Sequence, residues 1–155
     1  MSDEQLDDLT QPQRDRLAFV ELRVRFIGDI RRQDLVSRFG IQSAAATRDL
    51  AIYKELAPGN IDYDTKAKCY VLGEDFKPLF DFPPERVLSW LTQGFGDGEP
   101  SQLKAWVASE IPSRLTHPDL DVLACVTRAV HQECPVRVVS HSLSSGLTER
   151  QIVPY

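Results

Sequence analysis

The fold of this chain is predicted by residues 31–70, RRQDLVSRFGIQSAAATRDLAIYKELAPGNIDYDTKAKCY. Three apolar side chains form one edge of a short helix over residues 32–39. Gly40 follows at the point where a left-handed residue turns the chain sharply. A second helix is expected over residues 43–56. Two short helices joined by a glycine turn are typical of a helix-turn-helix.

The second of these helices has an apolar stripe and a polar N-terminal end. The stripe consists of Ala46, Leu50, Tyr53 and Ala57, spaced as one face of a helix that packs on a core. The other sides begin with small or hydrogen-bonding residues, which suit the base edges and phosphates of a DNA major groove. The sequence therefore predicts DNA contacts from this end of the helix and from the start of the preceding one, at Arg32, Gln42, Ser43, Ala44, Thr47 and Arg48.

A two-stranded ribbon follows the second helix. Ile61 and Tyr63 alternate at strand period before a turn over residues 64–68, and a second strand follows the turn. Lys66 and Lys68 lie at the tip, where they can reach a phosphate backbone. A solvated hairpin turn favours lysines as well, so the tip alone leaves both interpretations open. Helix, turn, helix and ribbon together predict a winged helix-turn-helix.

A net positive charge is found only in the winged-helix part of the chain. The 155 residues carry a net charge of −5, which by itself argues against a nucleic-acid partner. Residues 13–72, however, hold eleven Lys and Arg against eight Asp and Glu, a net charge of +3. Both flanking segments are acidic, each with a net charge of −4. This basic excess is small for a DNA-binding domain, so we expect dimerisation to contribute to affinity.

Four segments are expected along the chain. Residues 1–13 form a polar, disordered tail, and residues 14–75 form the winged helix-turn-helix. Residues 76–113 form a linker and dimerisation region with one helix over residues 84–93, whose many aromatic side chains indicate that it is docked. The remaining part, residues 114–155, starts with a helix over 118–132, continues as a strand over 135–141 and returns as a second strand from residue 150. Two strands cannot form a stable domain, so either the chain is a fragment or other strands complete the sheet.

The first helix, expected over residues 14–27, is apolar on two sides. Leu17, Val20, Val24 and Ile27 share one side, and Phe19, Leu22 and Phe26 share the other. Each side must be covered by something. The second side is expected either to belong to the core or to join two subunits.

Several other classes of protein are not supported by the sequence. Its N-terminus is acidic and it has no long apolar run, which predicts a cytoplasmic protein without a membrane partner. Cys69, Cys125 and Cys134 lack metal-ligand spacing and are expected to be buried, reduced thiols. His131, His141 and nearby polar residues form no catalytic arrangement. We expect no enzyme activity, no metal and no cofactor.

The stretches DLVSRFGIQSAAATRDL, YDTKAKCYV, EDFKPLF and PVRVVSHSLSSGLTERQIVP resemble the bacterial WYL-domain transcriptional regulators, especially those associated with antiphage defence loci. The resemblance covers most of residues 14–155, although the Trp-Tyr-Leu signature is absent and Ser140 stands where such strands often carry a tyrosine. It implies a homodimer that binds double-stranded DNA at an inverted repeat and acts as a repressor.

The same resemblance implies that the C-terminal residues form the opening helix and hairpin of an incomplete Sm-like β-barrel. Such a barrel would sense a nucleotide-like effector, with Ser142, Ser145 and Arg150 as candidate ligand-binding residues. The expected fold class is mainly α with a small β component (α+β). The alternative function is a winged-helix protein-protein interaction module that does not bind DNA.

Overall fold

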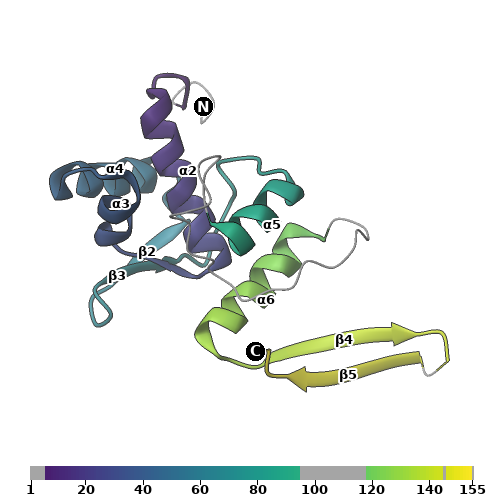
Figure 1. Cartoon of the computed structure of the whole chain (residues 1–155). Helices are drawn as coiled ribbons and strands as arrows, with labels where there is room; N and C mark the ends of the chain where they lie inside the picture. Colours follow the sequence, from purple (N-terminus) through teal and green to yellow (C-terminus); the bar gives the residue numbers. More distant parts are fainter. Residues whose placement is uncertain (1–5, 95–117, 145, 155) are drawn as a thin grey trace. The chain divides into compact units, whose positions relative to one another are not determined.

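A computed structural model of the chain describes residues 6–94, 118–144 and 146–154 (Figure 1). The chain divides into two compact units, Met1–Pro83 and Pro84–Tyr155. Among the described residues, no helix is long and apolar enough to cross a membrane. The fold is mixed α and β, as the sequence predicts.

The first unit is a winged helix-turn-helix. Its elements are α2 (Gln11–Phe26), β1 (Asp29–Ile30), α3 (Arg32–Phe39), α4 (Ser43–Leu56), β2 (Ile61–Asp64) and β3 (Cys69–Leu72). The bounds of α3 and α4 agree with the prediction. The strands form an antiparallel sheet in the order β1-β3-β2, visible below α3 and α4 in Figure 1.

Two details of this unit differ from the prediction. Helix α2 begins at Gln11, three residues earlier than expected, with Pro12 in its first turn, where a proline costs no helical hydrogen bond. Strand β1 was not expected, because a pair of residues carries no alternation for a pattern to detect. It is positioned by its partner β3, with Ile30 opposite Tyr70.

Helix α2 is the centre of the core, and both of its apolar sides are buried. On the second side, the Phe19 ring meets Phe39 of α3 edge-on, with ring centroids 5.4 Å apart. Leu22 and Phe26 on that side are fully buried as well. The hypothesis that this side of α2 joins two subunits is therefore wrong, because the chain covers it with its own residues.

The turn between α3 and α4 has the expected left-handed residue. Gly40 ends α3 at φ 63°, and its N–H donates to the Val36 carbonyl. The apolar stripe of α4 is confirmed, since Ala46, Leu50 and Tyr53 are buried. The turn and stripe together leave the N-terminal end of α4 exposed.

The connector after the wing is docked, as its composition predicts. Residues 76–83 belong to the first unit. The N–H groups of Leu79 and Phe80 donate to the buried carboxylate of Glu21 in α2. The Arg25 guanidinium also lies 5.8 Å from the centre of the Phe76 ring.

The second unit contains α5 (Pro84–Gln93), α6 (Leu120–Gln132), β4 (Val136–Ser142) and β5 (Gly146–Ile152). Helix α5 has the predicted bounds. Helix α6 begins two residues later than expected, because Asp119 is its N-cap and accepts hydrogen bonds from two first-turn N–H groups. Strand β5 begins at Gly146, four residues earlier than expected.

The three cysteines are free thiols, but they differ in burial. Cys69 is buried, Cys134 is half-buried and Cys125 is exposed on α6. The expectation of three buried thiols is therefore wrong for Cys125, which lies beside Val126 on a side of α6 that the described residues leave exposed.

Candidate nucleic-acid interface

The N-terminal end of α4 presents small polar side chains to solvent. Gln42 is the N-cap, with an extended backbone at φ −72° and ψ 150°, and Ser43 and Ala44 follow as the first helical residues. All three are exposed. The first N–H groups of a helix have no partner within it, and the helix dipole makes this end partly positive. Such an end favours an anion such as a phosphate.

One turn further along α4, Thr47 and Arg48 are also exposed. The Thr47 hydroxyl donates to the Ser43 carbonyl at 2.9 Å. Its proton is thereby occupied, so Oγ1 can offer only its lone pairs to a ligand, as a hydrogen-bond acceptor beside the methyl group. These two groups complement an amino donor and an apolar contact on a base edge. Arg48 adds a charged, planar donor, which suits a guanine edge or a phosphate.

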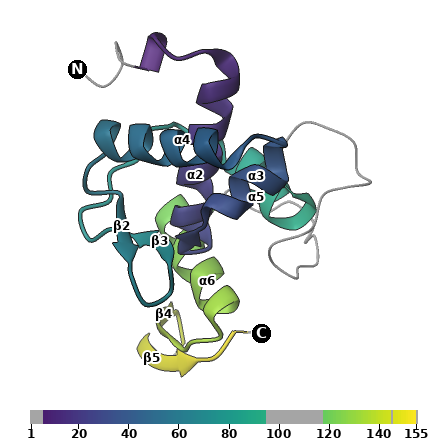
Figure 2. The same ribbon diagram turned by 90° about the vertical axis from the view of Figure 1, so that its left-hand side faces the viewer.

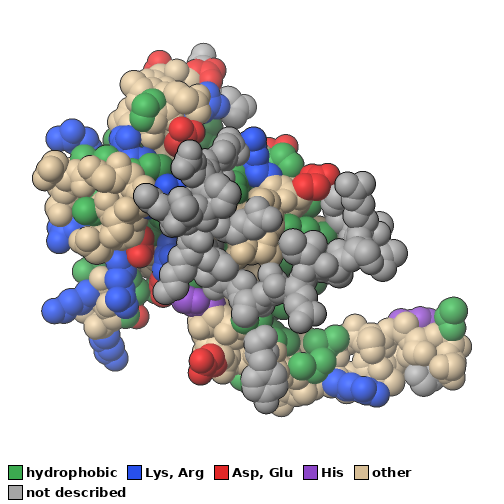
Figure 3. All heavy atoms as spheres, viewed as in Figure 1, with side chains coloured by type: hydrophobic (Ala, Val, Ile, Leu, Met, Phe, Trp, Pro, Cys, Tyr) green, Lys and Arg blue, Asp and Glu red, His purple; other side chains and the backbone are tan. Residues whose placement is uncertain are grey.

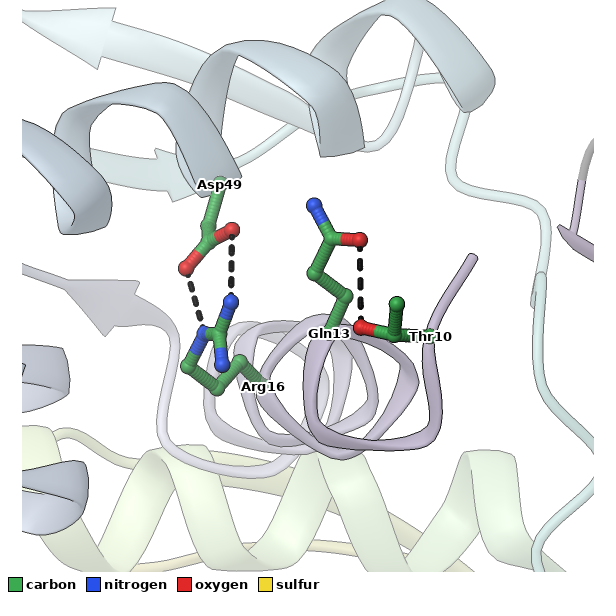
Figure 4. Close-up of polar contacts among 4 residues, drawn as sticks. All are labelled: Thr10, Gln13, Arg16 and Asp49. Carbon is green, nitrogen blue, oxygen red and sulfur yellow. Dashed lines mark hydrogen bonds and ion pairs between the residues drawn. The ribbon is translucent and has the colours of Figure 1, made fainter. Parts of the chain in front are cut away.

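An ion pair holds α4 against α2 behind this exposed end. Arg16 Nε lies 2.6 Å from Asp49 Oδ2, and an Arg16 terminal nitrogen lies 3.3 Å from Asp49 Oδ1 (Figure 4). Figure 4 also shows Gln13 and Thr10 near the start of α2, linked by a 3.3 Å hydrogen bond. Asp49 is buried although it is the direct neighbour of Arg48. The sequence analysis missed this pair, because a charged residue next to an apolar stripe usually faces solvent.

The wing turn is ordered by Asp64. Its Oδ1 accepts hydrogen bonds from the N–H groups of Lys66 and Ala67 at 2.8 and 3.0 Å, which closes the turn through a side chain. Lys68 takes the left-handed conformation, with φ 53°, and leads into β3. Both lysine side chains are exposed at the tip, where the sequence predicts them. The rigid turn fixes their backbone while their side chains remain in solvent.

The predicted DNA-binding residues lie on three parts of one unit. Arg32 is exposed at the first residue of α3, and the others lie at the N-terminal end of α4 or on the wing turn. Figure 3 shows Lys and Arg side chains gathered along the left margin of this face, over α3, α4 and the turn between β2 and β3. The view in Figure 2 turns that margin toward the viewer, with α4 crossing the unit above the wing. Basic side chains thus lie over both helices of the helix-turn-helix and over the wing turn (Figure 3).

The candidate ligand-binding residues of the C-terminal hairpin are only partly described. Ser142 and Arg150 lie on the same face of the β4-β5 pair, because Ser142 is opposite Gly146 and Arg150 is opposite Val138. Between them, Ser140 and Thr148 share a hydrogen bond of 2.8 Å. Ser145 lies outside the described residues. The described part of the chain contains no group of three or more His, Cys, Asp or Glu side chains that could hold a metal ion.

A known protein family matches the part of the chain that carries the predicted DNA-binding residues. Residues 12–93 match the model of the winged helix-turn-helix domain of the BrxR transcriptional regulator. That range runs from α2 to α5 and includes both the exposed end of α4 and the wing.

Three relatives are DNA-binding transcriptional repressors named CapW. The chain is 41% identical to the Pseudomonas aeruginosa protein over 146 residues, 90% of this chain and 49% of that protein. It is 30% identical to an Escherichia coli protein over 146 residues with the same coverage. A Stenotrophomonas maltophilia protein is 39% identical over 64 residues, 41% of this chain and 21% of that protein. The chain thus spans about half the length of the first two relatives.

Proposed function

This chain belongs to the family of BrxR-type winged helix-turn-helix transcriptional regulators, and we propose that it represses transcription by binding double-stranded DNA. The observation that carries the proposal is the pairing of an exposed α4 N-terminus with an exposed, rigid wing turn that bears Lys66 and Lys68. The names of the relatives support the same activity.

We assign the roles of the side chains from their chemistry. Ser43 and the first N–H groups of α4 bind a phosphate, and Thr47 and Arg48 contact base edges in the major groove. Arg32 and the wing lysines bind phosphates on either side, which adds affinity without sequence preference.

The full-length regulator is proposed to be a symmetric dimer. One winged helix with a net charge of +3 over residues 13–72 contacts little DNA, and two copies related by a two-fold axis contact twice as much. Such a dimer reads an inverted repeat whose half-sites lie about 10 base pairs apart, or a multiple of that spacing. Residues 76–113 are the proposed linker and dimerisation region. Sedimentation of the full-length protein tests this directly, since a monomer that binds one half-site with full affinity would contradict it.

The C-terminal residues are proposed to begin a ligand-sensing WYL domain over residues 114–155. In this proposal, α6 and the β4-β5 hairpin open an Sm-like barrel that senses a nucleotide-like effector through Ser142, Ser145 and Arg150. The exposure of Val139 and Leu147, on the same face of the hairpin, supports a further layer of structure over this pair of strands.

Replacement of Arg48 tests the proposed function. Duplexes enriched from a random-sequence library by the unaltered chain supply the DNA probe. Arg48→Ala should lose about 1 to 3 kcal/mol of binding free energy and relax the preference at one base pair. Arg137→Ala is the matched control, because it removes the same charge from an exposed position in the hairpin.

The outcomes separate the possible functions. If all sequences weaken together in Arg48→Ala, the side chain binds a phosphate rather than a base. If the variant binds as tightly as the unaltered chain, α4 does not read DNA. Failure of the unaltered chain to enrich any duplex would favour a winged-helix adaptor that binds another protein.

A further inference from the structure

A buried carboxylate links three segments of the first unit that are far apart in the sequence. Glu21 of α2 is completely buried. Its oxygens accept hydrogen bonds from Leu79 N–H at 2.8 and 3.0 Å and from Phe80 N–H at 2.9 Å. The Tyr53 hydroxyl of α4 donates to the same carboxylate at 2.9 Å. One side chain thus joins α2, α4 and the connector.

A second side chain completes the attachment of the connector. Asn60 is buried just before β2, and its Nδ2 donates to the Lys77 carbonyl at 2.7 Å while its Oδ1 accepts from Lys77 N–H at 2.8 Å. The same Nδ2 also donates to the Tyr53 hydroxyl at 3.0 Å. Pro78 has no N–H, so Glu21 and Asn60 bind every N–H group of residues 77–80. We name residues 77–80 the strap.

The strap is held in place by hydrogen bonds more than by the burial of its side chains. Lys77 and Pro78 are exposed, and Leu79 and Phe80 are only half-buried. Segments with little apolar burial open at a lower free-energy cost than the core. By contrast, removing the hydrogen-bond donors of a buried carboxylate carries a large free-energy cost, because water cannot easily replace them. Release of the strap would therefore break all of these hydrogen bonds and leave the Glu21 carboxylate buried without its donors.

The Tyr53 hydroxyl connects this strap to the helix that is proposed to read DNA. Tyr53 is fully buried and lies ten residues after Ser43 on the same continuous helix. A helix is stiff over this distance of roughly 15 Å. A small shift of α4 on DNA therefore moves the hydroxyl that Glu21 and Asn60 share, and the strap continues directly toward α5 at Pro84.

We propose that Glu21 and Tyr53 are positioning residues that couple the α4 recognition helix to the strap, so that DNA binding tightens the strap and release of the strap weakens DNA binding. The coupling is reciprocal, as linkage between two sites requires. The proposal rests on the proposed function, because it assigns a partner to α4. It does not depend on dimerisation or on any effector.

Amide hydrogen exchange of the full chain, followed by NMR, tests the coupling. The probe is a duplex enriched from a random-sequence library by the unaltered chain. DNA should slow exchange at the Leu79 and Phe80 N–H groups by about fivefold or more in the unaltered chain. In Tyr53→Phe the strap keeps its bonds to Glu21, but this DNA-induced slowing should be lost. Tyr63→Phe is the matched control, since it removes the same hydroxyl from an exposed ring and should keep the effect.

The possible results are distinguishable. A merely structural role of Tyr53 would speed exchange with and without DNA and leave the DNA-induced difference unchanged, which would overturn the proposal. The same conclusion follows if DNA binds the unaltered chain without slowing exchange at the strap. Failure to enrich a duplex would instead refute the proposed function. If Tyr53→Phe does not fold, Glu21→Gln replaces it in the same experiment. This variant keeps one side-chain oxygen for the strap N–H groups but presents an amide group to the Tyr53 hydroxyl, so the DNA-induced slowing should again be lost.

Discussion

Removal of the Arg16 guanidinium is expected to destabilise the first unit far more than an ordinary surface substitution. Arg16 and Asp49 join α2 to α4 through two hydrogen bonds of 2.6 and 3.3 Å. Their side chains are only 15% and 3% exposed. The pair is therefore largely shielded from water and salt.

The magnitude follows from two opposing effects. At an effective dielectric constant of about 20, two unit charges roughly 3 Å apart attract by about 5 kcal/mol. The desolvation of Asp49 offsets much of this gain, so the intact pair contributes little net stability. After loss of Arg16, however, the cost of burying the carboxylate remains without compensation. Arg16→Met should therefore cost about 3 to 5 kcal/mol.

Equilibrium urea unfolding measures this cost. Because the chain has two compact units, the NMR signals of α2 and α4 should be followed rather than a global signal. The double variant Arg16→Met with Asp49→Leu replaces both charges by apolar groups and should recover most of the loss. Arg14→Met is the control on the same helix. Its ion pair with Asp7 is largely exposed, so its effect should stay within about 0.5 kcal/mol.

The reasoning is refuted if Arg16→Met costs no more than Arg14→Met. It is also refuted if the two single changes at Arg16 and Asp49 add within about 0.5 kcal/mol in the double variant, because residues in direct contact should not behave independently.

Three further predictions concern the wing, the turn and the buried carboxylate. Replacing Lys66 and Lys68 together by alanine should lower the slope of log binding constant against log salt by about 1 to 2, and an unaltered slope would mean that the wing does not touch DNA. Gly40→Ala should cost about 1 kcal/mol in urea unfolding, because φ is 63° while the space for a Cβ is open, and an unchanged midpoint would contradict this strain. Burial raises the pKa of Glu21 above its ordinary 4.5, although hydrogen bonds from Phe80, Leu79 and Tyr53 and the charge of Arg25 lower it. The folded state thus holds this proton more tightly than the unfolded state does, so the associated stability is present below about pH 4.5 and is lost as pH rises through the folded-state pKa. Glu21→Gln should remove this slope, and identical pH profiles of unfolding free energy would count against it.

Regular elements with a strong period could be predicted from the sequence. The stripe of α4 and the glycine that ends α3 are local patterns, and the structure confirms both of them. Strand β2 also forms where its alternation predicts a strand, although Tyr63 is exposed while Ile61 is buried. The resemblance to winged-helix transcriptional regulators is confirmed by the family match. Strand β1 was missed, since two residues hold no pattern and their conformation depends on β3.

The dimer hypothesis for the second side of α2 failed for a related reason. An amphipathic pattern shows that a side must be covered, but it does not show by what. Phe19 is covered by Phe39 of α3, twenty residues away in the sequence. Only the three-dimensional arrangement decides between a neighbouring helix and a second subunit.

The buried polar side chains could not be predicted, although they are central to the proposed coupling of α4 to the strap and to the prediction for Arg16. Glu21 occupies a helical position between two apolar sides, where a glutamate ordinarily faces solvent. Its partners Leu79 and Phe80 lie 58 and 59 residues further along the chain and use backbone N–H groups, which every residue except proline possesses. No residue type at those positions signals the contact. Asp49 and Arg16 are likewise 33 residues apart. A single sequence therefore predicts which surface of α4 faces outward, while the polar contacts that fix the angle of α4 against α2 and the connector come only from the fold.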